Sequence, residues 1–325
     1  MKVAFIARST LKSVSGGDTT QILQTAKHLE KIGKIKVDIY SSHNDIEYDQ
    51  YDLLHFFNII RPADHLKHAE QCRIPYVISP IYVDYHDFDT RGRMGASRYV
   101  FKVLGKNWSE YAKNLARFIK KQDKPTSLKY LLGHKQAVKK LLKGADCVLP
   151  NSLSEWNRLV ADYRVSVPFH VIPNGIDEQL FVEEAPLEER EKRILCVGQL
   201  YGRKNQHVLI LACKELGLPL VLIGKSPPNH KAYLDLCKSM AEGSDVSFHD
   251  FMPQEELKSF YRKSYVHVLP SWFETTGLST LEAGAMGCKL VVGRGGDTTE
   301  YFDGIAEFCE AGNIESIKDA IIRAL

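Results

Sequence analysis

The stretch that decides the fold is Leu269-Pro270-Ser271-Trp272-Phe273-Glu274-Thr275-Thr276-Gly277-Leu278-Ser279-Thr280-Leu281-Glu282-Ala283-Gly284-Ala285-Met286-Gly287. The β-rich run that ends at Leu269 predicts a strand, which Pro270 and Ser271 stop. Apolar residues at helical spacing then predict a helix that ends near Gly287. Between strand and helix, a turn of hydroxyl residues and glycine leaves backbone N–H groups free at a helix N-terminus. The stretch therefore predicts an anion-binding turn.

Two carboxylates belong to this stretch. Glu274 lies in the turn, and Glu282 follows eight residues later, about two helical turns along. One carboxylate can meet one end of a bound polyol while the other meets the opposite end. Two glutamates at this spacing also occur by chance, so the surrounding residues must support the interpretation. They read P-S-x-x-E-T-x-G-L-x-x-L-E-A-x-A-x-G, which resembles the E-x7-E signature of the retaining GT-B glycosyltransferases, group 1 (family 4).

Length and composition set the class of protein. The 325 residues suit two domains, and the apolar content provides two cores. The cysteines are scattered without a C-x-x-C pair, which is typical of reduced thiols in the cytoplasm. The opening run, from Met1 to Ala7, has the pattern of a first strand and not of a basic leader, and no apolar stretch is long enough to span a membrane. We expect a cytoplasmic protein.

Strand-like runs alternate with helical stretches along the chain, which predicts an α/β fold with parallel, doubly wound sheets. The resemblance implies the GT-B architecture, with two facing Rossmann-like domains and an interdomain cleft. The turn Pro173-Asn174-Gly175-Ile176-Asp177 matches the family turn that opens the second domain. We therefore expect an acceptor-side domain at residues 1–172 and a nucleotide-sugar-binding domain at 173–325, without the crossover helix that commonly ends such chains.

A glycine pair follows the first predicted strand, in Ser15-Gly16-Gly17-Asp18. The pair can let the backbone approach a phosphate or sugar, or it can form an ordinary strand-to-helix turn. It is not G-x-G-x-x-G, so a dinucleotide fingerprint is absent. In the resembling family, a Gly-Gly loop at this place faces the cleft and binds the donor.

The first half also departs from the family pattern. Many relatives place a histidine beside the donor sugar where Ile81 stands here. Close behind it, Asp84 and His86 stand in a loop dense in polar side chains, and we predict that one of them, His86 above all, serves the acceptor side. The alternatives are a solvated acidic loop and a divalent-metal site. His55 ends another strand as in the family's D-x-x-H, and it can be functional or a satisfied core histidine.

Residues 97–143 carry thirteen Lys plus Arg against two acids. The first helix predicted here, 97–122, is basic and amphipathic with Trp and Tyr, a pattern that fits an anionic membrane surface. The second, 127–143, fits better as an ordinary helix packed on the sheet. We expect peripheral membrane binding and a sugar or lipid-linked sugar acceptor. No nucleic-acid-reading motif accompanies the charge.

In the second domain, a strand ends at Gly198 and leads to Lys204-Asn205, which falls on the family's K-[NG], whose lysine meets the donor diphosphate. The arginine usual after the strand glycine is replaced by Gln199, and Arg203 can supply the missing charge. A solvated basic turn is the alternative for Arg203. The strand turn at Gly224 is expected to hold the nucleotide base through the backbone.

The resemblance implies a retaining hexosyl transfer from a nucleoside-diphosphate sugar, without a metal or other cofactor. Glu274 would bind sugar hydroxyls and Glu282 the ribose. The distal phosphate would meet Lys204 and Arg203 together with the turn residues Thr275, Thr276, Gly277 and Leu278. A role in surface polysaccharide or glycolipid assembly follows. The main alternative is a nucleotide-sugar-binding GT-B protein that has lost catalysis; an epimerase is another, and the absent fingerprint argues against an NAD oxidoreductase.

Overall fold

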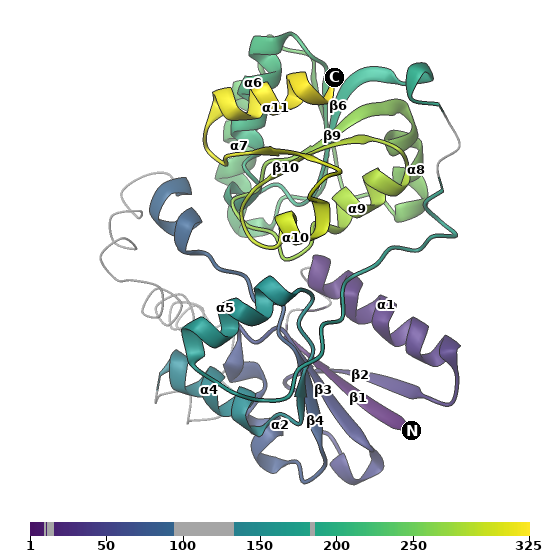
Figure 1. Ribbon diagram of the computed structural model, residues 1–325, viewed down its shortest axis with the longest axis vertical. Helices are drawn as coiled ribbons and strands as arrows, with labels where there is room; N and C mark the ends of the chain where they lie inside the picture. The colour runs from purple at the N-terminus through teal and green to yellow at the C-terminus, as the bar shows by residue number, and fades with distance from the viewer. Residues whose placement is uncertain (10, 12–15, 94–132, 183–185) are drawn as a thin grey trace. The chain divides into compact units, whose positions relative to one another are not determined.

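The computed structural model describes residues 1–9, 11, 16–93, 133–182 and 186–325 (Figure 1). Within these ranges the chain forms two compact units, one of residues 1–83 and 133–173, the other of residues 84–93 and 174–325. The main division lies one residue beyond the predicted boundary at 172. Residues 84–93 were expected in the first domain but belong to the second unit, because their aromatic side chains pack on its turns.

The first unit contains a five-stranded parallel sheet in the order β2-β1-β3-β4-β5. Its strands are β1 Lys2–Ala7, β2 Lys36–Ser41, β3 Leu53–Phe57, β4 Tyr76–Ser79 and β5 Cys147–Val148. Its helices are α1 Gly17–Ile32, α2 Leu66–Gln71, α4 His134–Gly144 and α5 Leu153–Tyr163. β1 lies inside the sheet and is apolar and buried from Val3 to Ala7, as a strand covered on both faces should be.

The second unit contains a six-stranded parallel sheet in the order β11-β10-β9-β6-β7-β8. The strands are β6 Glu191–Val197, β7 Leu220–Ile223, β8 Val246–His249, β9 Ser264–Leu269, β10 Lys289–Gly293 and β11 Glu307–Cys309. The helices are α6 Gln206–Leu216, α7 Lys231–Ala241, α8 Gln254–Lys263, α9 Leu278–Ala285, α10 Thr298–Phe302 and α11 Ile314–Ala324. The predicted parallel, doubly wound architecture is confirmed in both units.

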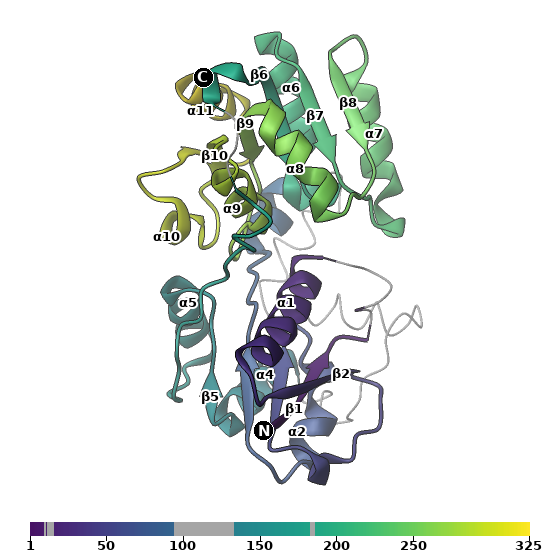
Figure 2. The same cartoon turned by 90° about the vertical axis from the view of Figure 1, so that its right-hand side faces the viewer.

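Helices cover both faces of the second sheet. Apolar side chains of α6, α7 and α11 form one core with the strands, and those of α8, α9 and α10 form the core on the other face. Figure 1 shows α6 and α7 on one side of the sheet and α8 and α9 on the other, and Figure 2 gives the view at right angles. Because all strands run in parallel, their carboxyl ends share one edge, where ligands of open α/β sheets bind.

Candidate functional site

The turn after β9 is fixed by a second loop that follows β10. The N–H of Glu274 donates to the carbonyl of Gly295 at 3.1 Å, and the N–H of Asp297 donates to the carbonyl of Glu274 at 2.8 Å. Gly296, between them, has φ +91°, and a Cβ there would lie 2.1 Å from the Glu274 carbonyl oxygen. Only glycine fits this approach. The backbone of Glu274 is therefore held on both sides.

Lys204 reaches Glu274 from the short helix Gly202–Lys204 after β6. Its Nζ lies 2.6 Å from Oε1 of Glu274, and the two side chains are 13% and 9% exposed. Burial acts to raise the pKa of Glu274, but the charges of Lys204 and Arg203 outweigh it and hold that pKa below its ordinary value. At neutral pH the pair is a carboxylate against an ammonium. The sequence predicts both residues as part of the site, but it does not predict the ion pair between them.

Arg203 ties the Lys204 turn to the Glu274 turn. Its Nη1 donates to the carbonyl of Phe273 at 2.5 Å and its Nε to the hydroxyl of Tyr201 at 3.0 Å. In return, the N–H of Trp272 donates to the Arg203 carbonyl at 2.9 Å. The guanidinium is buried and these nitrogens are engaged with the protein. Contact of Arg203 with a diphosphate stays a prediction; what the geometry gives it is a structural role.

The N-terminus of α9 carries free donors. The predicted helix start at Leu278 is confirmed. Within the described chain, no acceptor takes the backbone N–H of Thr276, Gly277 or Leu278. Gly277 precedes the helix with φ +84°, and half-buried Thr275 lies in the same turn. Nδ2 of Asn174 donates to Oγ1 of Thr276 at 3.0 Å and fixes the turn from the side. The arrangement offers N–H groups to an anion beside Lys204.

Glu282 differs from Glu274 in its surroundings. It is buried, its Oε1 accepts from Nε2 of Gln254 at 2.7 Å, and its Oε2 accepts from the hydroxyl of Tyr261 at 2.8 Å. Burial raises the pKa of Glu282, and the hydrogen bonds from Gln254 and Tyr261, which act to lower it, offset this only in part. The carboxylate is thus oriented by uncharged donors, which suits it to accept hydrogen bonds from hydroxyl groups.

Two predicted glycines meet where β6 and β7 end. Gly224 has φ +149°, and a Cβ there would lie 2.1 Å from the carbonyl oxygen of Gly198. A Cβ on Gly198 would in turn lie 3.7 Å from Cε of Lys204. The approach of the two strand ends therefore requires glycine at position 224, whereas a Cβ on Gly198 would make only an ordinary van der Waals contact with the lysine stem.

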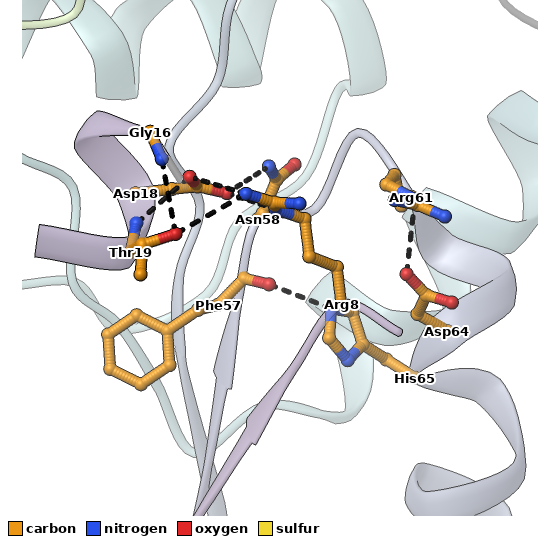
Figure 3. Close-up of polar contacts among 9 residues, drawn as sticks. All are labelled: Arg8, Gly16, Asp18, Thr19, Phe57, Asn58, Arg61, Asp64 and His65. Atoms are coloured by element: carbon orange, nitrogen blue, oxygen red, sulfur yellow. Dashed lines mark hydrogen bonds and ion pairs between the residues drawn. The ribbon is translucent and has the colours of Figure 1, made fainter. Parts of the chain in front are cut away.

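Figure 3 shows Gly16 and the polar contacts at the start of α1 in the first unit. The N–H of Gly16 donates to Oγ1 of Thr19 at 3.3 Å, and Asp18 lies in the first turn of α1. Arg8, just after β1, binds both oxygens of Asp18, with Nε to Oδ2 at 2.6 Å and Nη2 to Oδ1 at 3.1 Å. The N–H of Thr19 donates to Asp18 Oδ1 at 2.9 Å. The N-terminus of α1 therefore already holds a carboxylate, that of Asp18, whose charge Arg8 neutralises.

Figure 3 also draws a neighbouring polar group after β3. Nδ2 of Asn58 points to Asp18 Oδ2 at 3.5 Å, Arg61 pairs with buried Asp64 at 3.2 Å, and Nε2 of His65 is hydrogen-bonded to the Phe57 carbonyl at 2.9 Å. These contacts fix the chain after β3. No sequence motif marks these residues.

Three other positions of the first half have distinct fates. His55 is buried, its Nε2 is hydrogen-bonded to Ser79 Oγ at 2.9 Å, and burial lowers its pKa to about 3, which matches the core-histidine alternative. Ile81 is buried at φ +45°, a strained conformation for a β-branched residue. His86 is exposed and belongs to the second unit, not to the first unit where an acceptor-side residue was expected.

Sequence reasoning missed three buried polar side chains around the Lys204 turn and α9. Side-chain atoms of Asn205, His267 and Thr280 find no hydrogen-bond partner in the part of the chain that is described. Unsatisfied polar groups are uncommon in protein cores. Asn205 and Thr280 lie within the quoted motifs, whereas His267 is one polar residue in an apolar strand and gave no signal.

Most of the basic segment 97–143, including its first predicted helix, lies outside the described residues. Its last part forms α4, which buries Ala137, Val138, Leu141 and Leu142. Lys140 pairs with Glu70 of the first unit. This portion is an ordinary packed helix, as expected for the second of the two. Over the described ranges, no helix has the length and hydropathy that a membrane span requires.

The second unit matches a known protein family. Residues 177–325 match the family described as glycosyl transferases, group 1. A D-inositol 3-phosphate glycosyltransferase of Corynebacterium diphtheriae is 28% identical over 179 residues, which is 48% of this chain and 42% of that protein. The chain spans about half the length of the curated relatives it matches.

Two solved structures share the fold of nearly the whole chain. The sucrose-phosphate synthase of Thermosynechococcus elongatus aligns with a TM-score of 0.74 at 16% identity, covering 99% of this chain and 89% of that one. Anabaena HepE, solved in complex with UDP-glucose, aligns with a TM-score of 0.67 at 15% identity, also covering 99% and 89%. At such identities the likeness establishes the fold.

Proposed function

We propose that this chain transfers a hexose from a nucleoside-diphosphate sugar to an acceptor hydroxyl, because residues 177–325 match the group 1 glycosyl transferases and the fold is GT-B. The bond between the anomeric carbon and the distal phosphate oxygen breaks, and the nucleoside diphosphate leaves. The acceptor oxygen bonds to the same face of that carbon, so the configuration is retained. The acceptor proton passes to the departing phosphate, and no metal or further cofactor takes part.

One observation carries the proposal: the buried Lys204–Glu274 pair lies beside a helix N-terminus whose N–H groups are free. The ammonium and the N–H groups of Thr276, Gly277 and Leu278 supply positive charge where negative charge builds on the leaving phosphate. Fixed groups of this kind stabilise a transition state without reorganisation. Glu274, with its second oxygen, serves the sugar hydroxyls, and Glu282 the ribose.

Nucleotide binding is the first test. A ligand that binds only the folded protein raises its melting temperature by mass action. UDP, GDP, ADP and NAD are titrated in a thermal-shift assay, and we expect one nucleoside diphosphate to stabilise the protein clearly and NAD to have no effect. The matching sugar nucleotide is then offered with acceptors, with and without EDTA. Stabilisation by none of the diphosphates would contradict the proposal.

The basic segment 97–143 bears on the kind of acceptor. We propose a sugar or lipid-linked sugar acceptor, used in surface polysaccharide or glycolipid assembly on the cytoplasmic side of a membrane, because residues 97–143 are strongly basic. Basic segments bind anionic bilayers at low ionic strength. Sedimentation with phosphatidylglycerol vesicles, against phosphatidylcholine vesicles as control, tests this. Equal recovery in both supernatants at low salt would contradict the membrane claim.

A second candidate is a nucleotide-sugar-binding protein without transfer. It is favoured by Ile81, which is apolar, buried and strained where many relatives carry histidine, and by Gln199 in place of arginine. This candidate predicts the same thermal shift but no nucleoside-diphosphate release with any acceptor. Transfer at a measurable rate would reject it.

A further inference from the structure

Residues 84–93 interrupt the first unit in sequence, after β4, but pack with the second unit. They fold into a short π-helix, Phe88–Gly92, which the N–H of Arg93 closes by donating to the Phe88 carbonyl at 2.9 Å. Asp89 is buried and accepts from Nε of Arg93 at 2.7 Å. A single π-turn of this kind is uncommon and frequently lies at a functional site. The segment is thus an ordered part of the second unit.

The segment covers the turn that carries Lys204. The ring of Phe88 packs on Gly202, where a Cβ would lie 3.0 Å from Cζ of Phe88. The ring centroid of Tyr85 lies 5.7 Å from the guanidinium carbon of Arg203, within the range of a cation–π contact. Gly202 and Arg203 are the two residues before Lys204, so the aromatic pair rests on the backbone that aims the lysine.

The same segment meets the other turn through Trp272. A Cβ on Gly92 would lie 2.6 Å from Cε2 of Trp272, and one on Gly312 would lie 2.7 Å from its Cζ2. Real Cβ atoms do not approach this closely, so the indole lies where only glycine on both neighbours admits it. Trp272 precedes Glu274 by two residues, and its backbone N–H donates a hydrogen bond to the backbone carbonyl of Arg203. The segment therefore touches both turns whose side chains form the ion pair.

We propose that residues 84–93 are a positioning element of the donor site, in which Tyr85, Phe88 and Gly92 hold the turns of Lys204 and Glu274 in register. The inference rests on the proposed transfer reaction and adds a part of the chain that no motif assigns to it. None of these three residues is required to touch the donor. They position the two turns through Arg203 and Trp272, whose backbones are hydrogen-bonded to each other.

The test compares Tyr85→Ala with Tyr85→Phe, which keeps the ring over Arg203 and loses only the hydroxyl. Gly92→Ala is the second disturbing variant, and Asp87→Ala, an exposed side chain of the same segment, is the matched control. Each full-length variant is assayed for kcat, donor KM and the pH profile of kcat, after its melting temperature shows that it is folded.

We expect Tyr85→Ala and Gly92→Ala to lower kcat about tenfold or more, since small displacements of catalytic groups cost about that much. Donor KM should change far less. The acid limb of the pH profile should move to higher pH, because Glu274 loses the cations that keep it ionised. Tyr85→Phe and Asp87→Ala should resemble the parent protein.

An active parent protein, with kcat and acid limb unchanged in both disturbing variants, would overturn the inference and leave the proposed function intact. A parent protein that binds no nucleotide and transfers no sugar would instead overturn the proposed function, and the inference with it. A loss of kcat in Asp87→Ala as large as in Tyr85→Ala would also overturn it, because the effect would then not depend on the packed side chains.

Discussion

Replacing Lys204 with methionine tests the central ion pair. Methionine keeps most of the aliphatic stem and removes the charge, so Glu274 stays 9% exposed without its 2.6 Å partner. Removing one member of a buried pair costs about 3–5 kcal/mol, because the remaining charge is desolvated and uncompensated. Arg203 remains nearby, so we expect the lower end, about 3 kcal/mol, in the unfolding of the second unit.

The double variant Lys204→Met/Glu274→Gln removes both charges and should cost less than the sum of the single changes, with a coupling of about 1–3 kcal/mol. The assay is urea unfolding at pH 7, followed by tryptophan fluorescence and fitted with a separate transition for each unit, because a two-unit chain need not unfold in one step. Lys231→Met is the control: it removes a lysine whose side chain is 79% exposed and paired with Asp235, and it should leave stability nearly unchanged.

The pH dependence gives an independent check of sign. In the parent protein the pKa of Glu274 lies below its ordinary value near 4.5, so the pair stabilises the fold above that pH and this stability is lost as pH falls. In Lys204→Met, burial dominates and raises the pKa, so the variant loses stability as pH rises. The gap between the two proteins must therefore widen from pH 4 to 7. A constant gap, or additive single changes, would refute the reasoning.

Three further predictions concern single positions. Gly224→Ala should lower the free energy of unfolding of the second unit in urea by at least about 2 kcal/mol, because its Cβ would lie 2.1 Å from the Gly198 carbonyl oxygen. Gly243→Ala, also at positive φ but with nothing within 4 Å, should cost about 1 kcal/mol, and equal losses would contradict the steric argument. Glu282→Ala should weaken nucleotide binding about tenfold by calorimetry, since half-buried Gln254, buried Tyr261 and a ligand hydroxyl lose their acceptor. An unchanged Kd would reject the role of Glu282 at the ribose. Burial lowers the pKa of His55 to about 3 in the folded state. Its contribution to stability is therefore complete above the ordinary pKa of 6.5 and is lost as pH falls toward 3, by at most about 1.4 kcal/mol per pH unit. His55→Gln should make the urea midpoint depend less on pH between about pH 6.5 and 5, and an unaltered slope would show that His55 titrates normally.

Local sequence patterns predict much of the fold. The strand before Pro270 and the helix start at Leu278 follow from periodicity and turn residues over a few positions. Likewise, buried apolar runs such as β1 gave the parallel sheets. These features depend on neighbours in sequence, so one sequence suffices to predict them.

Other features depend on contacts between distant residues. Nothing near Arg203 shows that its guanidinium would bind the Phe273 carbonyl, seventy residues on, and not face solvent or a ligand. The packing of Phe88 on Gly202 likewise joins segments more than a hundred residues apart, so the sequence does not show that residues 84–93 pack with the second unit. The φ of +45° at Ile81 has no sequence signal at all, because β-branched residues disfavour it.

The carboxylate of Asp18 at the start of α1 gives the two units opposite preferences for charge. A free helix N-terminus attracts anions, and the one at α9 is open beside Lys204, whereas the one at α1 is already filled from within and balanced by Arg8. A phosphate brought to α1 would meet a carboxylate, while a hydroxyl group would meet a good hydrogen-bond acceptor. The two helix starts therefore differ in their electrostatics: the one at α9 favours an anion, whereas the one at α1 is already occupied by a carboxylate that Arg8 balances.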